Sequence, residues 1–108
     1  MVKGLHIRCG QDRDAEILAH VNVAMARETE GRELVFDTVL AGVKNVLAKP
    51  EYGFYVIAEK EGEIVGSLMV TKEWSDWNDG FYWWIQSVFV RPEFRRQGIY
   101  TKLYTIIL

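Results

Sequence analysis

Two adjacent arginines and a glycine stand between an apolar segment and a short run at helical spacing. Arg95 and Arg96 follow the apolar residues 81–90 and precede Gln97 and Gly98. A strand that leads through a glycine loop into a helix can bind an anion, because the first N–H groups of a helix have no internal partner and the helix dipole is positive there. Glycine also lets a phosphate approach the backbone closely. The loop predicts phosphate binding, or in the plainer interpretation a helix start with solvated arginines.

Seven elements are expected around this loop, from alternation typical of strands and from apolar spacing typical of helices. Their order, β-α-α-β-β-β-α, predicts an α/β (α+β) fold. The elements are a strand over residues 5–9, a helix from Asp12 that fades across residues 27–31, a helix over residues 36–47 that ends before Pro50, strands over residues 54–59, 64–71 and 81–90, and a helix after Gly98.

Length and composition restrict the class of protein. A chain of 108 residues with 49% hydrophobic and 26% charged residues is typical of a single globular domain. Its net charge of −2 argues against nucleic acid as a partner, and no apolar run is long enough to predict a membrane span. Cys9 is the one cysteine, so we expect no internal disulfide, no metal and a cytoplasmic location.

The segment around the arginines closely resembles motif A of the GCN5-related N-acetyltransferases (GNAT). Residues 88–100 read VFVRPEFRRQGIY. The motif is an apolar strand followed by V-x-P-x-x-R and then by Q/R-x-x-G-x-G/A at the start of a helix. The resemblance extends from Leu5 to Leu108. It implies a GNAT-like acyl-CoA N-acyltransferase fold with a mixed, mostly antiparallel sheet.

The resemblance implies acetyl-CoA as co-substrate. Arg95 corresponds to the Q/R position of the motif and Gly98 to its glycine. The family's backbone amides at the helix start hold the pyrophosphate, its strand pairs with the pantetheine arm, and a strand amide polarises the thioester carbonyl. The implied cofactor-binding residues are Ser87, Val88, Phe89, Val90, Arg95, Arg96, Gln97, Gly98, Ile99, Tyr100 and Thr101.

The sequence departs from the family in two places. Tyr100 stands at the final G/A position, where its bulk either crowds the pyrophosphate or points away and restricts the loop. Family members also continue past this helix, so we expect residues 1–108 to form a single, incomplete GNAT domain truncated after the motif A helix. The family's tyrosine that protonates the leaving thiolate has no counterpart here, because Tyr104 lies on the motif helix.

All four tryptophans lie within residues 74–84, next to the implied acyl site. Trp74, Trp77 and Trp84, together with Gln86, are candidates for the walls of an acceptor pocket, since aromatic faces attract cationic amines. The alternative is ordinary core packing with cross-strand pairs.

An amine must lose a proton to accept an acetyl group, so a base or a water chain is required. Glu73 and Asp76 are the nearest carboxylates in the sequence, and Glu73 is the candidate catalytic base. The plainer interpretation of Glu73 is a solvated surface acid. His6 and His20 are assigned no role.

The leading hypothesis is an acetyl-CoA-dependent N-acetyltransferase that moves an acetyl group to an amine by direct transfer in a ternary complex. The alternative is a non-catalytic CoA-binding or interaction module. A third hypothesis is an aromatic-pocket binding protein with an incidental basic loop. Because an uncovered apolar helix and strand edge are costly, we expect a homodimer or a swapped assembly.

Overall fold

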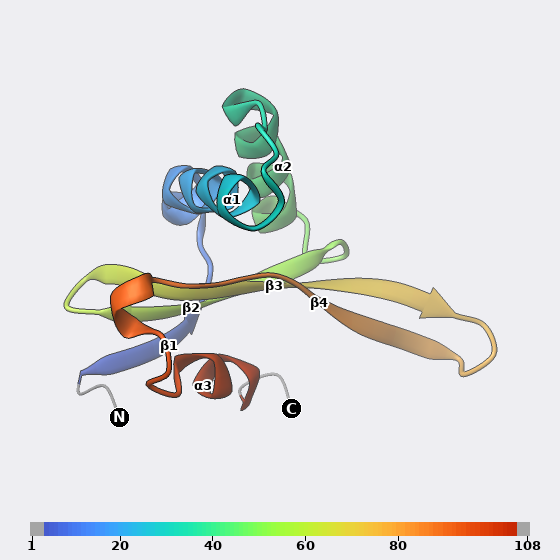
Figure 1. Ribbon diagram of the computed structural model, residues 1–108. Helices are drawn as coiled ribbons and strands as arrows, with labels where there is room; N and C mark the ends of the chain where they lie inside the picture. The colour runs from blue at the N-terminus through green and yellow to red at the C-terminus, as the bar shows by residue number, and fades with distance from the viewer. Residues whose placement is uncertain (1–3, 106–108) are drawn as a thin grey trace.

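The computed structural model describes residues 4–105, in which a sheet lies between two layers of helices (Figure 1). Helices α1 and α2 lie over one face of the sheet, and α3 lies over the other. The order of these elements confirms the predicted β-α-α-β-β-β-α succession. The elements are β1 (Leu5–Cys9), the 3-10 turn η1 (Asp12–Asp14), α1 (Ala15–Glu30), α2 (Phe36–Ala48), β2 (Gly53–Lys60), β3 (Glu63–Ser75), β4 (Gly80–Val90), the 3-10 turn η2 (Pro92–Phe94) and α3 (Ile99–Thr105).

The strands of residues 4–105 pair in the order β1-β2-β3-β4, so consecutive strands are neighbours and β4 lies at an edge. All three pairings are antiparallel, so the described residues contain no parallel pair of the expected mixed sheet. The turn between β2 and β3 is as tight as predicted. Glu61 and Gly62 both have positive φ there, 51° and 81°, as a two-residue hairpin turn of the favoured twist requires.

Two apolar layers hold the helices on the sheet, because β2 and β3 bury side chains on both faces. Burial of apolar surface is the main favourable term in this packing. The layer beneath α1 and α2 has a buried centre of Ala15, Leu18, Ala19, Val43, Tyr55 and Ile57. The layer above α3 has a buried centre of Val56, Ala58, Val65, Leu68, Val70, Ile99 and Leu103.

Helix α1 differs from its prediction at both ends. Asp12 was expected to cap it, but Asp12 lies in η1, and the carboxylate of Asp14 instead accepts from the backbone N–H of Gln11 at 2.7 Å. The predicted fading across residues 27–31 is wrong, because the helix continues to Glu30. Gly31 ends it in the left-handed conformation, with φ of 63°. The added turn brings further polar side chains beside β4.

Strands β3 and β4 form a hairpin that projects beyond both helical layers (Figure 1). No helix covers this projecting part, so the aromatic side chains of the whole hairpin, from β3, the turn and β4, stay exposed. These exposed residues are Trp74, Trp77, Phe81, Tyr82, Trp83 and Trp84. Of the plainer interpretation, core packing therefore does not describe the tryptophans in residues 4–105, whereas the expected cross-strand pairing is present between Trp74 and Phe81.

Candidate functional site

A β-bulge interrupts the pairing of β3 with β4. Ser67 pairs with Phe89 and Met69 with Gln86, so two residues of β4, Ser87 and Val88, lie opposite one residue of β3. A bulge leaves its extra residue outside the ladder and redirects the strand. Ser87 has φ of 52°, which is a left-handed conformation that a residue with a side chain adopts at a cost. The strand is therefore bent at the segment that the GNAT resemblance assigns to the pantetheine arm.

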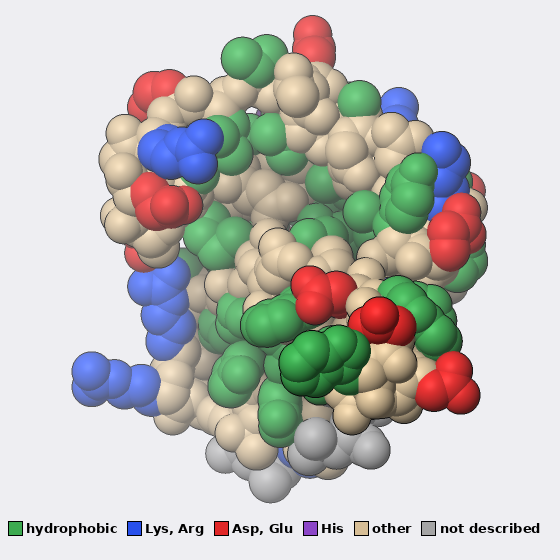
Figure 2. Space-filling view, turned by 90° about the vertical axis from the view of Figure 1, so that its right-hand side faces the viewer, with side chains coloured by type: hydrophobic (Ala, Val, Ile, Leu, Met, Phe, Trp, Pro, Cys, Tyr) green, Lys and Arg blue, Asp and Glu red, His purple; other side chains and the backbone are tan. Residues whose placement is uncertain are grey.

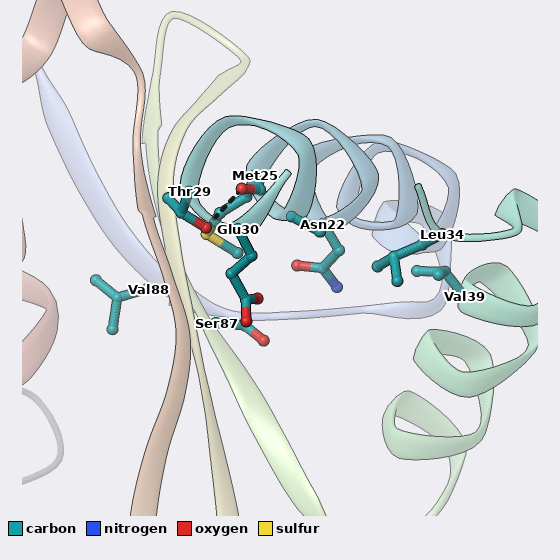
Figure 3. Close-up of a pocket in the computed structure, with 9 residues that line it drawn as sticks. Asn22, Met25, Thr29, Glu30, Leu34, Val39, Ser87 and Val88 are labelled. Carbon is teal, nitrogen blue, oxygen red and sulfur yellow. Dashed lines mark hydrogen bonds between the residues drawn. The ribbon is translucent and has the colours of Figure 1, made fainter. Parts of the chain in front are cut away.

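A groove follows β4 from the bulge to the loop before α3. Its largest cavity, of about 470 Å³, lies between the end of α1, the start of α2 and the bulge (Figure 3). Adjoining cavities of about 290, 330 and 240 Å³ share Ser87, Val88 or Val90 with their neighbours along the groove. Figure 2 shows this side of the molecule hollowed, with hydrophobic side chains in and around the hollow. The groove thus connects a roomy end at α1 with the glycine loop.

Gly98 lies at the end of the groove that is nearest to α3. Its φ is 81°, and a Cβ atom placed on it would meet no atom within 4 Å, so the space beside its backbone is open. The carbonyl of Gly98 accepts the first helical bond from Lys102, at 3.1 Å. The backbone N–H groups that come before Lys102 in this first turn therefore have no acceptor within the helix. This combination suits the approach of a phosphate to the backbone.

Arginine side chains flank this loop in different ways. Arg95 lines the same cavity as Gly98, and its Nε donates to the carbonyl of Val90 at 3.0 Å. Its Nη2 donates to Glu28 of α1 at 3.2 Å. Arg96 is exposed and has a positive φ of 64°. Positive charge is therefore present at the mouth of the cavity, where the sequence predicted it.

Tyr100 lies on the outer face of α3, where its ring is 6.0 Å from that of Tyr104, one turn later. It is exposed and lines the cavity beside Gly98 and Thr101. In this rotamer the ring packs along the helix. The departure from the family's G/A position therefore leaves the cavity at Gly98 open.

The two faces of the β3–β4 hairpin separate the residues predicted to bind the acceptor. Val70 and Ile85 are paired and belong to the α3 layer, so the next pair, Thr71 and Trp84, faces the α1 and α2 side. Gln86 shares that face and donates to Thr71 at 2.6 Å. Trp84 and Gln86 therefore face the α1 and α2 side, although neither lines the cavities described along the groove.

Trp74 pairs with Phe81 and lies on the opposite face, where their ring centroids are 5.2 Å apart. Trp77 is at the turn and is 93% exposed. Glu73 pairs with Tyr82 on the α1 and α2 face but is exposed and lines none of the cavities along the groove. Its role as a base stays a prediction.

The sequence did not single out the groove residues that come from α1. Asn22, Met25, Thr29 and Glu30 line the largest cavity, and Figure 3 shows Glu30 extending from the end of α1 toward β4. Their signal in the sequence is weak: Asn22 is a polar residue on an apolar helical face, Met25 belongs to that face, and Thr29 and Glu30 fall in the segment expected to fade.

Asn22 is held in place by Tyr55. Its Nδ2 donates to the hydroxyl of Tyr55 at 3.0 Å, beneath one of the cavities. Burial raises the pKa of this phenol, and the bond from Asn22 offsets only part of the effect. Tyr55 is therefore a neutral acceptor at physiological pH, and it fixes the orientation of the amide that lines the groove.

Residues 4–105 contain no cluster of three or more histidine, cysteine, aspartate or glutamate side chains placed to bind a metal ion. None of the helices described in that range combines the length and the apolar character that crossing a membrane requires.

A bent edge strand, a groove along it and a glycine loop at a helix start form the arrangement that the GNAT resemblance implied. Several solved structures have a similar fold. A "possible acetyltransferase" from Clostridium difficile 630 has a TM-score of 0.90 at 39% identity, over 97% of this chain and 69% of that chain. An integron cassette protein from the mobile metagenome of Cole Harbour Salt Marsh has a TM-score of 0.87 at 24% identity, over 94% and 66%.

A third structure was solved with acetyl-CoA. It is a "predicted acetyltransferase" from Clostridium acetobutylicum, with a TM-score of 0.80 at 19% identity, over 95% of this chain and 70% of that chain. For the structures at 24% and 19% identity, the similarity shows the fold alone. The chain spans about two thirds of the length of the solved structures it matches, as the 66% and 72% of two of them illustrate.

The family of this chain follows from the match of its sequence to a family model. The model of the acetyltransferase (GNAT) family matches residues 14–108. This chain belongs to the GNAT family, as its motif A segment predicted. No curated protein matches the sequence.

Proposed function

We propose that this protein is an N-acetyltransferase that moves an acetyl group from acetyl-CoA to an amine by direct transfer in a ternary complex. The observation that carries the proposal is the continuous groove from the bulge at Ser87 to the open backbone at Gly98. Membership of the GNAT family supports acetyl-CoA as the co-substrate.

The residues present fit acetyl-CoA along this groove. The open space beside Gly98 and the first amides of α3 would hold the pyrophosphate, with Arg95 and Arg96 supplying positive charge. The end of β4, which has a free edge in residues 4–105, would pair with the pantetheine arm as with an added strand. The full proposed set is Ser87, Val88, Phe89, Val90, Arg95, Arg96, Gln97, Gly98, Ile99, Tyr100 and Thr101.

Acetyl-CoA supplies a thioester that an amine can attack. In the transfer a C–N bond forms, the C–S bond breaks, the sulfur leaves as a thiolate and the nitrogen loses a proton. The bulge at Ser87 supports a role for strand amides here, because an amide outside the ladder is free to donate to the carbonyl oxygen as negative charge develops on it. Glu73 is retained as a proposed base, and Trp74, Trp77, Trp84 and Gln86 as proposed acceptor contacts.

The second candidate function is a CoA-binding module without turnover. The same groove would bind acetyl-CoA, but no acetylated amine would form. The two functions differ in one observable, the release of free CoA thiol in the presence of an amine.

The first experiment is a calorimetric titration with acetyl-CoA of the wild type, Gly98→Asp and Gly98→Asn. Both residues tolerate positive φ and have nearly the same size, and the space beside Gly98 is open, so they differ chiefly in charge. We expect Gly98→Asp to bind at least about tenfold more weakly than Gly98→Asn, because its carboxylate faces the pyrophosphate. Equal affinities would place the cofactor elsewhere, and a folded wild type that does not bind would refute the proposal.

We further propose that the chain forms a homodimer or a swapped assembly. The free edge of β4 in residues 4–105 and the exposed aromatic hairpin support this, because uncovered edges and apolar patches are sites of association. Light scattering at rising protein concentration tests it, and a constant monomer mass would refute it. The cytoplasmic location stays a prediction.

A further inference from the structure

The largest cavity has an unusual distribution of charge. Among its lining residues Glu30 is the single charged side chain, and the others are apolar or neutral. Asn22 uses one N–H to donate to Tyr55, and the Thr29 hydroxyl donates to the carbonyl of Met25, while Ser87 is a further neutral polar residue of the lining. The cavity thus offers one carboxylate among apolar and neutral polar side chains, at a volume of about 470 Å³ that suits a small molecule.

Glu30 differs from the acids that surround it in the sequence. Glu28 pairs with Arg95 at 3.2 Å, and Glu33 pairs with Arg27 at 2.9 Å. Within residues 4–105 no cation pairs with Glu30. Glu28 lines the adjoining cavity together with Arg95 and does not line this one, so Glu30 is the exposed carboxylate of this cavity that is free to bind a cation from solution.

The position of Glu30 is close to the proposed reaction centre. Glu30, Ser87 and Val88 line the same cavity, and in Figure 3 the Glu30 side chain extends from α1 toward Ser87. A cation held by Glu30 would therefore lie beside the bulge of β4. The apolar side chains of Met25, Leu34 and Val39 line the remainder of the cavity and suit an uncharged body attached to that cation.

From this arrangement we infer that the acceptor is a small primary amine on an apolar body, without a carboxylate of its own, and that Glu30 binds its ammonium group. This inference rests on the proposed acetyl transfer. An amino acid is disfavoured because its carboxylate would be repelled by the like charge of Glu30, and no basic side chain lines this cavity to compensate. The nearest arginine of the groove, Arg95, is paired with Glu28.

A matched pair of probes tests the inference. 2-Phenylethylamine and phenylalanine share the amine and the aromatic body and differ in the carboxylate. We expect kcat/KM for 2-phenylethylamine to exceed that for phenylalanine at least about tenfold, and Glu30→Gln to lower it about tenfold or more, chiefly through KM. Calorimetric titration of the CoA-loaded protein with 2-phenylethylamine should show the same loss of affinity without requiring turnover.

The control is Glu33→Gln, which removes the same charge from the surface nearby and should change kcat/KM less than twofold. Equal use of the two probes, or equal effects of the two variants, would overturn the inference. If acetyl-CoA binds but neither probe is bound or acetylated, the acceptor class is wrong and the cofactor site stands. If acetyl-CoA itself does not bind, the proposed function fails and the inference fails with it.

Discussion

Arg95 Nη2 lies 3.2 Å from Glu28 Oε1, so the loop before α3 is tied to the last turns of α1 beside the groove. The two side chains are 46% and 55% exposed, and an ion pair this exposed contributes little to stability. The ion pair matters for binding, because it engages the Arg95 guanidinium that the proposed pyrophosphate site uses. In the proposed complex Arg95 exchanges a carboxylate for a phosphate.

Removing the competing carboxylate should therefore strengthen binding of acetyl-CoA. We expect Glu28→Gln to raise the affinity about two- to fivefold, which corresponds to the contribution of an exposed ion pair. Arg95→Ala should lower the affinity about tenfold, because a charge-assisted hydrogen bond to phosphate is lost. Calorimetric titration at low and high salt measures both changes. Weaker binding by Glu28→Gln would show that the ion pair holds the site together.

The conformation of Ser87 leads to a prediction about stability. Its φ of 52° costs energy for a residue with a Cβ atom and costs glycine almost nothing. We expect Ser87→Gly to leave the free energy of unfolding unchanged or higher, and Ser87→Val to lower it by about 1–2 kcal/mol. Urea denaturation measures both. A stable Ser87→Val variant would mean that the bulge relaxes at no cost.

The buried ion pair of Arg8 with Asp14 should make stability depend on pH. Arg8 donates to both carboxylate oxygens at 2.8 Å, and Asp14 is nearly inaccessible. Burial alone would raise the pKa of Asp14, but the bonds from Arg8 and from the Gln11 amide outweigh it and hold that pKa below its usual value. The folded state thus has the lower pKa, so this stabilisation is complete at neutral pH and is lost as pH falls through that value.

The corresponding variant is Asp14→Asn. We expect it to lower the free energy of unfolding by about 2 kcal/mol near neutral pH, because bonds to a charged group are lost. The difference from the wild type should shrink as the pH falls below about 4, the usual pKa of aspartate. Urea denaturation across this range measures it. A difference that does not change with pH would show that the charge of Asp14 is not the cause.

The two faces of the hairpin predict unequal effects of similar substitutions. Trp84 is 53% exposed on the face toward α1 and α2, and Phe81 is 58% exposed on the other face. If the acceptor is a cation beside the groove, Trp84→Ala should raise its KM about two- to fivefold, through loss of a cation–π contact. Phe81→Ala should leave KM unchanged. The reverse order would place the acceptor on the α3 side.

The order of elements and the glycine loop could be predicted from the sequence because both depend on local patterns. Periodicity identifies strands and helices, and the spacing of Arg95 and Gly98 identifies the loop without reference to distant residues. The single bulge in β4 could not be predicted, since it depends on the register against β3. That register decides which face each hairpin residue presents, and so it separates Trp74 from Trp84.

The acceptor end of the groove was missed for a different reason. Polar residues at the end of α1 suggested a loop, whereas the helix continues to Glu30 and ends at Gly31, which has the left-handed conformation. Tertiary structure also matters: Glu28 and Glu30 both lie in the polar end of α1, but Glu30 lines the cavity of about 470 Å³, whereas Glu28 lines the adjoining one with Arg95. Glu73 was predicted as the base because it is one of the nearest carboxylates in the sequence, but it lines none of the cavities along the groove.

The confinement of all four tryptophans to the β3–β4 hairpin has a spectroscopic consequence. Their emission reports on this one hairpin, while circular dichroism reports on the helices of both layers. Trp74, Trp83 and Trp84 are each about half exposed, and Trp77 is almost fully exposed. Their emission can therefore shift toward shorter wavelengths over a wide range when an apolar partner covers them. Native fluorescence can therefore follow ligand binding or association at the hairpin directly, with no added label.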